Sequence, residues 1–188
     1  METFGSSNNV ESETKICLMI TMSFNKAIKK LKSSKEFKKF KDKNKQAFMF
    51  SAFFVLQPDF SIENQQLDYY ISKKKKVETF KINDKIEHKE DEFKPKDKII
   101  ALNENIKIDI PEIKKIIEKE LEKEKLNMYS INKIIAILQK HKNKQIWNIT
   151  CLLSGFKMLR LHVDCFSGKI IESHKGSMLD FIQIKSNK

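Results

Sequence analysis

Arginine, glycine, proline and cysteine are all scarce in this sequence of 188 residues, and each shortage excludes a class of protein. Four glycines and three prolines are too few for a collagen-like chain or for a Gly-rich or Pro-rich linker. The three cysteines, Cys17, Cys151 and Cys165, are an odd number without a Cys-x-x-Cys pair, which argues against a disulfide framework and a zinc site. We expect reduced, partly buried thiols in a cytoplasmic protein.

Only one of the 37 basic residues is an arginine, Arg160, so nearly all of the positive charge is on lysine. Lysine is a solvated point charge. It lacks the planar guanidinium with which arginine makes paired hydrogen bonds to guanine or to phosphate. The formal net charge of +12 therefore favours non-specific attraction to polyanions over sequence readout. An AT-rich genome, which also favours Ile, Asn and Phe, explains the same lysine content, and both explanations remain open here.

Long apolar runs are also missing. The longest near the start, residues 16–20, is far below the ~20 residues that a membrane-spanning helix needs. Acidic residues precede it, so it lacks the basic region of a signal peptide. We expect residues 1–22 to be a disordered tail or the result of a wrongly assigned start, with Met22 as the true first residue. The sequence gives no reason to expect a membrane partner.

The first half begins with helical patterns. Ser23 is a good N-cap for a helix with the apolar stripe Phe24, Ala27, Ile28 and Leu31. A capping box of Ser33 with Glu36 predicts a second short helix, with Phe37 and Phe40 on one face.

Strand patterns follow at residues 47–56, 67–72 and 77–82, with residues 73–76 as an exposed hairpin tip. The charged connector 83–98 holds one more short strand near Ile86. Within residues 47–56, even spacing predicts that Phe48, Phe50 and Phe54 share the inward face and that Phe53 points the other way. A strand with two apolar faces is either central in a sheet or part of an interface, so a homodimer through this sheet is one hypothesis.

The second half repeats this order of elements. Ile106, Ile108 and Ile110 alternate briefly. Asp109 then caps a helix, with Pro111 in its first turn and Glu112 completing a capping box. The predicted buried stripe is Ile113, Ile116, Ile117 and Leu121. Strand patterns follow at residues 134–138, 146–153, 158–164 and 169–172, and residues 177–184 predict a terminal helical turn.

Together these patterns predict an α+β protein of two helix-plus-antiparallel-meander units, with helices packed on one face of curled sheets. The units span residues 23–98 and 99–188. The stretches LDYYISKKKKVE from Leu67 and LHVDCFSGKIIE from Leu161 share a strand-turn-strand pattern, which favours an internal repeat.

One hairpin of the second half resembles a known family. The stretch VDCFSGKII at residues 163–171, with Trp147 on the preceding strand, resembles the PepSY and cystatin-like domains over residues 109–172. The whole chain also resembles uncharacterised two-part proteins of small-genome archaea. The resemblance implies a helix followed by a curled meander, and a non-catalytic role as an inhibitory, chaperoning or ligand-binding module.

Motifs that carry chemistry are scarce. The histidines, His88, His141, His162 and His174, are scattered without metal-ligand spacing. His162 and Cys165 are close in sequence, but in an extended strand they point to opposite faces. Neither a dinucleotide-binding nor a P-loop pattern occurs. We therefore expect no enzyme activity, no cofactor and no metal.

The predicted function is a non-catalytic, intracellular interaction or ligand-binding module with an unknown protein or peptide partner. Its binding surface would be the concave side of a curled sheet or the groove between the halves. The alternative is non-specific binding of nucleic acid or a ribonucleoprotein by a lysine-rich surface. That surface would comprise Lys26, Lys29, Lys30, Lys38, Lys39, Lys41, Lys73, Lys74, Lys75 and Lys76. Basic residues on one continuous face would favour the alternative, and a deep apolar groove would favour the first function.

Overall fold

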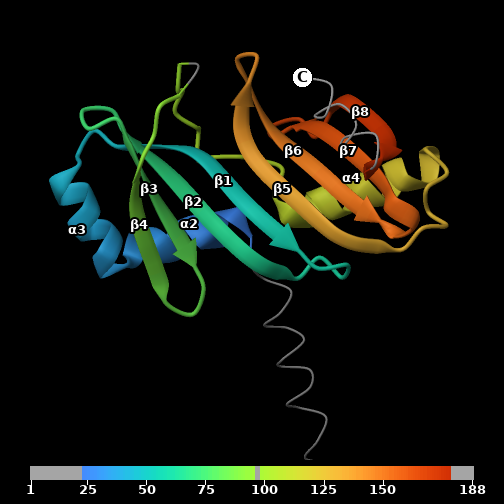
Figure 1. The fold of residues 1–188 in the computed structure, drawn as a ribbon, viewed down its shortest axis with the longest axis horizontal. Coiled ribbons are helices and arrows are strands. Elements are labelled where there is room, and N and C mark those ends of the chain that lie inside the picture. The colour runs from blue at the N-terminus through green and yellow to red at the C-terminus, as the bar shows by residue number, and fades with distance from the viewer. Residues whose placement is uncertain (1–22, 96–97, 179–188) are drawn as a thin grey trace, which may run out of the picture.

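A computed structural model describes residues 23–95 and 98–178 of the chain (Figure 1). The helices are α2 (Phe24–Ser33), α3 (Lys35–Lys43) and α4 (Ile110–Lys123). The strands of the first half are β1 (Phe48–Leu56), β2 (Ile62–Ile71), β3 (Lys76–Ile82) and β4 (Ile86–Glu92). Those of the second half are β5 (Ile131–His141), β6 (Lys144–Leu153), β7 (Lys157–Asp164) and β8 (Ile170–Ser177).

All these strands form one antiparallel sheet in the order β4-β3-β2-β1-β5-β6-β7-β8. Each half of the chain is a meander, and the two meanders join through β1 and β5, where Phe53 is opposite Ile137. The predicted α+β class is confirmed. The meanders make a single continuous sheet rather than separate ones because β1 and β5 satisfy their edge hydrogen bonds by pairing with each other.

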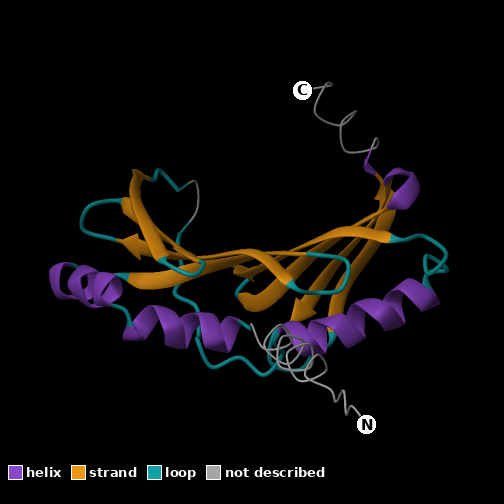
Figure 2. Cartoon of the chain, turned by 90° about the horizontal axis from the view of Figure 1, so that it is seen from below, coloured by secondary structure: helices purple, strands orange, loops and turns teal. Residues whose placement is uncertain are grey.

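The three helices α2, α3 and α4 lie on one face of the sheet (Figure 2). The apolar stripes predicted from the sequence face the sheet. All four stripe residues of α2 are buried, as are Ile113, Ile117 and Leu121 of α4, while Ile116 is half-buried against the core. Trp147 of β6 lies at the centre of this core, with its ring 6.2 Å from that of Phe24 and 5.8 Å from that of Phe54. The main core is therefore the layer between the helices and the sheet.

Asp109 joins the two halves at the beginning of α4. The predicted capping box is present, since Glu112 accepts a hydrogen bond from the backbone N–H of Asp109. The Asp109 carboxylate also accepts hydrogen bonds from the backbone N–H groups of Phe24 and Asn25, which begin α2. One buried carboxylate thus accepts hydrogen bonds from the N-termini of two helices that belong to different halves of the chain.

The faces predicted for the phenylalanines of β1 are partly wrong. A register shift between Met49 and Ser51 inserts a bulge at Phe50, so the alternation of faces is interrupted there. Phe48 and Phe50 consequently lie on the face turned away from the helices, while Phe54 is fully buried on the helix side. Phe53 points away from Phe54, as expected.

Some element boundaries also differ from the prediction. The N-cap of α3 is Ser34 rather than Ser33, because the backbone N–H of Phe37 donates to the Ser34 hydroxyl, while Ser33 ends α2. The edge strands β4 and β8 are longer than expected, since their exposed, charged residues do not show a clear alternation. Residues 106–109 are not a strand. The predicted tail 1–22 and the helical turn beyond Met178 lie outside the described residues.

Candidate functional site

The face of the sheet turned away from α2, α3 and α4, here called the open face, is left uncovered by these helices. Figure 1 looks onto this face. At its centre, neighbouring positions of β1 and β5 carry four half-buried apolar side chains. This central row comprises Phe53, Val55, Ile135 and Ile137.

Polar side chains flank the central row. On β6, Asn148 is opposite Ile137 and Thr150 is opposite Ile135. On β2, Gln66 is opposite Phe53, and the next open-face position is Asp68. Asp68 accepts a hydrogen bond from Thr79, but its burial raises the carboxyl pKa above the usual value. An apolar centre within a polar rim is the typical composition of a binding surface.

The two lateral edges of the sheet bend away from the helices, so the open face is concave (Figure 2). An aromatic cluster lies where β1 begins and β2 ends. The Tyr70 ring lies 5.8 Å from the ring of Phe48 and 6.3 Å from that of Phe93, and Phe93 lies 5.7 Å from Phe50. The sequence analysis missed this cluster, because the bulge at Phe50 is what turns two of its members to the open face.

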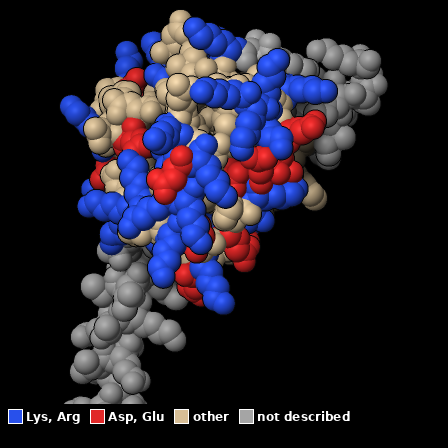
Figure 3. All heavy atoms as spheres, turned by 90° about the vertical axis from the view of Figure 1, so that its left-hand side faces the viewer, with Lys and Arg blue, Asp and Glu red and all other residues tan. Residues whose placement is uncertain are grey.

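Some of the predicted lysines line hollows at one end of the molecule. The structure brings the end of α3 beside the β2–β3 hairpin tip, where a hollow of about 340 Å³ is lined by Lys43, Lys45, Lys73 and Lys74 together with Asp42. A second hollow of about 400 Å³ includes Lys39 and Lys74. Figure 3 shows this end of the molecule covered largely by lysines, with acidic residues between them.

The remaining predicted lysines are placed differently. Within the described residues, the linings of the two hollows include none of Lys26, Lys29 and Lys30 of α2. Lys41 donates to the carbonyl of Ala47 at 2.8 Å, so it holds the turn after α3. At the hairpin, Lys74 and Lys76 both pair with Glu90, and the hydrogen bond from Lys76 lowers the pKa of Glu90. Lys43 and Lys45, which the sequence analysis left out, also line the first hollow.

The cysteines are placed in the core. Cys151 and Cys165 are both fully buried, and burial raises the pKa of the Cys151 thiol to about 12 and that of Cys165 to about 11. His162 lies on the other face of the sheet from Cys151, since it is opposite Asn148 on β6. The described residues thus bring no thiolate nucleophile to a histidine base.

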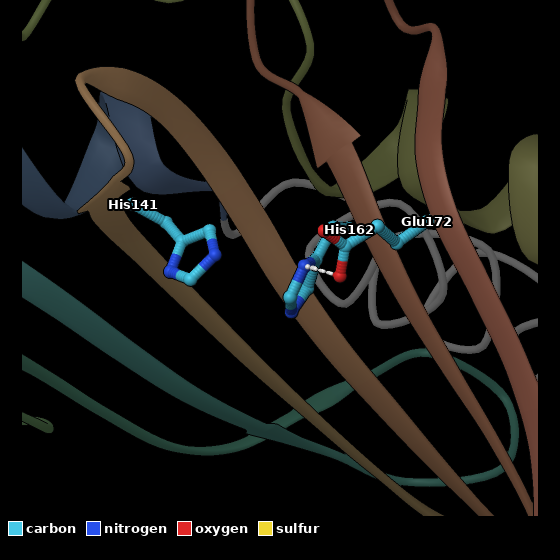
Figure 4. A group of neighbouring side chains, drawn as sticks. All are labelled: His141, His162 and Glu172. Carbon is cyan, nitrogen blue, oxygen red and sulfur yellow. Dashed lines mark ion pairs between the residues drawn. The ribbon is translucent and has the colours of Figure 1, made fainter.

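A group that the sequence analysis missed lies at one end of the open face (Figure 4). The rings of His141 and His162 are 5.2 Å apart, and Nδ1 of His162 is 3.0 Å from Oε2 of Glu172. Burial lowers the pKa of His162, while Glu172 acts in the opposite direction. The three residues come from β5, β7 and β8, so no local spacing in the sequence could reveal them.

No helix among the described residues is long and apolar enough to cross a membrane.

Comparisons with known proteins support the fold and nothing more specific. No protein-family model matches the chain, and no curated protein matches it by sequence. A crystal structure of a candidate lipoprotein from Clostridium difficile 630 is similar, with 16% sequence identity and a TM-score of 0.50. The similarity covers 75% of this chain and 90% of that chain. At this identity the similarity shows a shared fold alone.

Proposed function

We propose that the protein is a non-catalytic binding module that holds a segment of a partner protein on its open face. The observation that carries this proposal is the central row, four apolar side chains that remain half-buried instead of covered. Partly exposed apolar residues gathered on one concave surface are the usual mark of an interaction site. The polar rim supplies hydrogen bonds that would orient the partner.

The shape of the open face favours a macromolecular partner over a small molecule. Small-molecule sites are mostly enclosed and apolar. The hollow over β2–β4 has a volume of about 450 Å³, but its lining is polar and charged. This lining comprises Gln66, Thr79, Lys81, Glu87, His88, Lys89 and Asp91. A broad, shallow surface of this kind suits a peptide segment that places apolar side chains over the central row.

A library of random peptides displayed on phage tests this proposal. We expect enriched peptides to be rich in apolar residues and to lose about tenfold or more in affinity when Phe53→Thr and Ile137→Thr are combined. Threonine keeps the strand preference of both positions, so the fold should persist, which circular dichroism checks. The matched control combines Lys114→Thr and Lys119→Thr on α4. Peptides that bind both double variants and the wild type equally would contradict the proposal.

A second copy of this chain is another possible occupant of the open face. Sedimentation equilibrium of the wild type and of the Phe53→Thr, Ile137→Thr variant separates the two cases. A monomer over the whole concentration range agrees with a foreign partner. If the wild type is a dimer and the double variant is a monomer, the occupant of the open face is a second copy of the chain and not a foreign partner.

A second candidate function is polyanion binding by the hollow between α3 and the β2–β3 hairpin tip. The observation that favours it is the convergence of Lys43, Lys45, Lys73 and Lys74 on one hollow. Lysines gathered in this way attract phosphates without reading sequence.

Fluorescence anisotropy of mixed RNA and DNA oligonucleotides across a salt series tests this second function. If it holds, affinity falls steeply with salt, and replacing the four lysines by glutamine lowers the salt slope by roughly three to four. The control variant replaces four lysines elsewhere, namely Lys107, Lys114, Lys115 and Lys119, and so has the same net charge. Equal loss in both variants would mean that net charge alone attracts the nucleic acid.

We also propose that residues 23–98 and 99–188 are related units. Helix and four-stranded meander occur in the same order in both, and the antiparallel β1–β5 pairing places the two meanders in a pseudo-twofold arrangement. The resemblance of residues 109–172 to the PepSY and cystatin-like group stays a prediction. The cytoplasmic location expected from the sequence stays a prediction.

A further inference from the structure

We propose that His141, His162 and Glu172 form a binding site for a divalent transition-metal ion of the zinc type. Their potential ligand atoms, one from each residue, all lie within 4.8 Å of one another. Figure 4 shows the three side chains converging on the open face from different strands. β6 lies between His162 and the central row, and none of the three residues belongs to that row, so the site does not depend on the proposed binding of a partner.

The register of the sheet is what brings the three residues together. His162 and Glu172 are direct neighbours across the β7–β8 pairing. His141 ends β5, and its ring reaches over β6 toward His162. The backbone of β7 and β8 thus fixes two of the ligands, and the hairpin between β5 and β6 fixes the third.

The donor set selects the class of ion. Two imidazole nitrogens and one carboxylate oxygen suit Zn²⁺, Co²⁺, Ni²⁺ or Cu²⁺, whereas Ca²⁺ and Mg²⁺ prefer sites made of oxygen ligands. Ligand atoms of a tetrahedral zinc ion lie about 3.4 Å apart, given bonds of about 2.1 Å. The pair formed by His162 and Glu172 is already at 3.0 Å. The Glu172 side chain is half exposed. Rotation of His141 and Glu172 about their side-chain bonds can therefore bring all three ligand atoms to the spacing that a tetrahedral ion requires.

The surroundings leave room for an ion and a water molecule. The hollow beside the three residues has a volume of about 100 Å³, and Lys142, Lys144, Ile146 and Ile171 complete its lining. Three protein ligands leave one position of a tetrahedral ion for solvent. The ammonium of Lys142 lies 3.6 Å from Oε1 of Glu172, so it competes with a cation for that carboxylate.

Isothermal titration calorimetry with ZnCl₂ tests the site on an untagged chain that carries Cys17→Ser. Cys151 and Cys165 are fully buried, so this background leaves no accessible thiolate among the described residues. We expect one Zn²⁺ per chain, and no comparable binding of MgCl₂ or CaCl₂. Mutating a residue that only hydrogen-bonds to a metal ligand typically lowers metal affinity about 10–100-fold. His141→Ala, His162→Ala and Glu172→Gln should each cost at least as much.

Two further variants sharpen the result. His174, also on the open face of β8, is outside the group, so His174→Ala should bind Zn²⁺ as the wild type does. Lys142→Gln should bind it more tightly, because the competing ammonium is gone. Zn²⁺ should also raise the thermal midpoint of the wild type but not of His162→Ala, which shows binding to the folded state. Failure of the wild type to bind Zn²⁺, or equal binding by the three ligand variants, would overturn the site.

Discussion

Replacing Asp109 by alanine is expected to lower the free energy of unfolding by about 4 kcal/mol, as measured by urea denaturation. The Asp109 side chain is buried, and its carboxylate accepts hydrogen bonds from the backbone N–H groups of Phe24, Asn25 and Ile110 at 2.7–3.1 Å. Loss of a helix N-cap alone costs about 1 kcal/mol. The substitution also removes the charged acceptor of two donors in α2. The buried N–H of Phe24, left without a partner, adds roughly 1–3 kcal/mol, and the partly buried N–H of Asn25 adds less.

The convergence of two helices on Asp109 explains the size of this effect. Both α2 and α4 direct their positive ends toward the same carboxylate, which their dipoles stabilise. Alanine would leave both ends without that charge. Asparagine keeps one acceptor oxygen, so Asp109→Asn should fall between alanine and the wild type.

The control is Asp59, an exposed carboxylate that accepts hydrogen bonds from the backbone and side chain of Ser61. Asp59→Ala should change the free energy of unfolding by less than about 1 kcal/mol. If Asp109→Ala were equally mild, Asp109 would not be the link between the halves.

The sequence predicted the elements whose physical signals are local. The stripe of α2 and the capping box at Asp109 are confirmed, and so is most of the α4 stripe. The hairpin tip is confirmed with a shift of one residue, since the turn spans residues 72–75 and Lys76 begins β3. Each depends on spacing within a few residues, which helical or strand geometry turns directly into a face or a cap.

The parts that the sequence did not predict depend on pairing between distant residues. The bulge at Phe50 exists because of how β1 pairs with β2, and it reverses the faces of two phenylalanines. The group of His141, His162 and Glu172 depends on the register of four strands. Periodicity within one strand contains no information about its neighbours' register, so both the aromatic cluster and the proposed metal site became visible only in the folded chain.

Trp147 is the second position with a large expected effect. Trp147→Ala should lower the free energy of unfolding by about 3–5 kcal/mol, because it leaves a cavity in the core. The side chain is fully buried between Phe24 of α2 and Phe54 of β1, so the cavity would open between the helix layer and the sheet. It is the only tryptophan of the chain, so unfolding of the variants is followed by circular dichroism.

A conservative variant separates packing from hydrogen bonding at this position. The indole N–H donates to the carbonyl of Ile108 at 2.7 Å, which anchors the segment that leads into α4. Trp147→Phe keeps an aromatic ring but loses this bond and part of the packed volume, so we expect a loss of about 2–3 kcal/mol, smaller than that of the alanine variant. Met128, which is 76% exposed, is the control, and Met128→Ala should cost less than about 0.5 kcal/mol. A phenylalanine variant as unstable as the alanine variant would contradict this account, because it would show that an aromatic ring at this position adds nothing to stability.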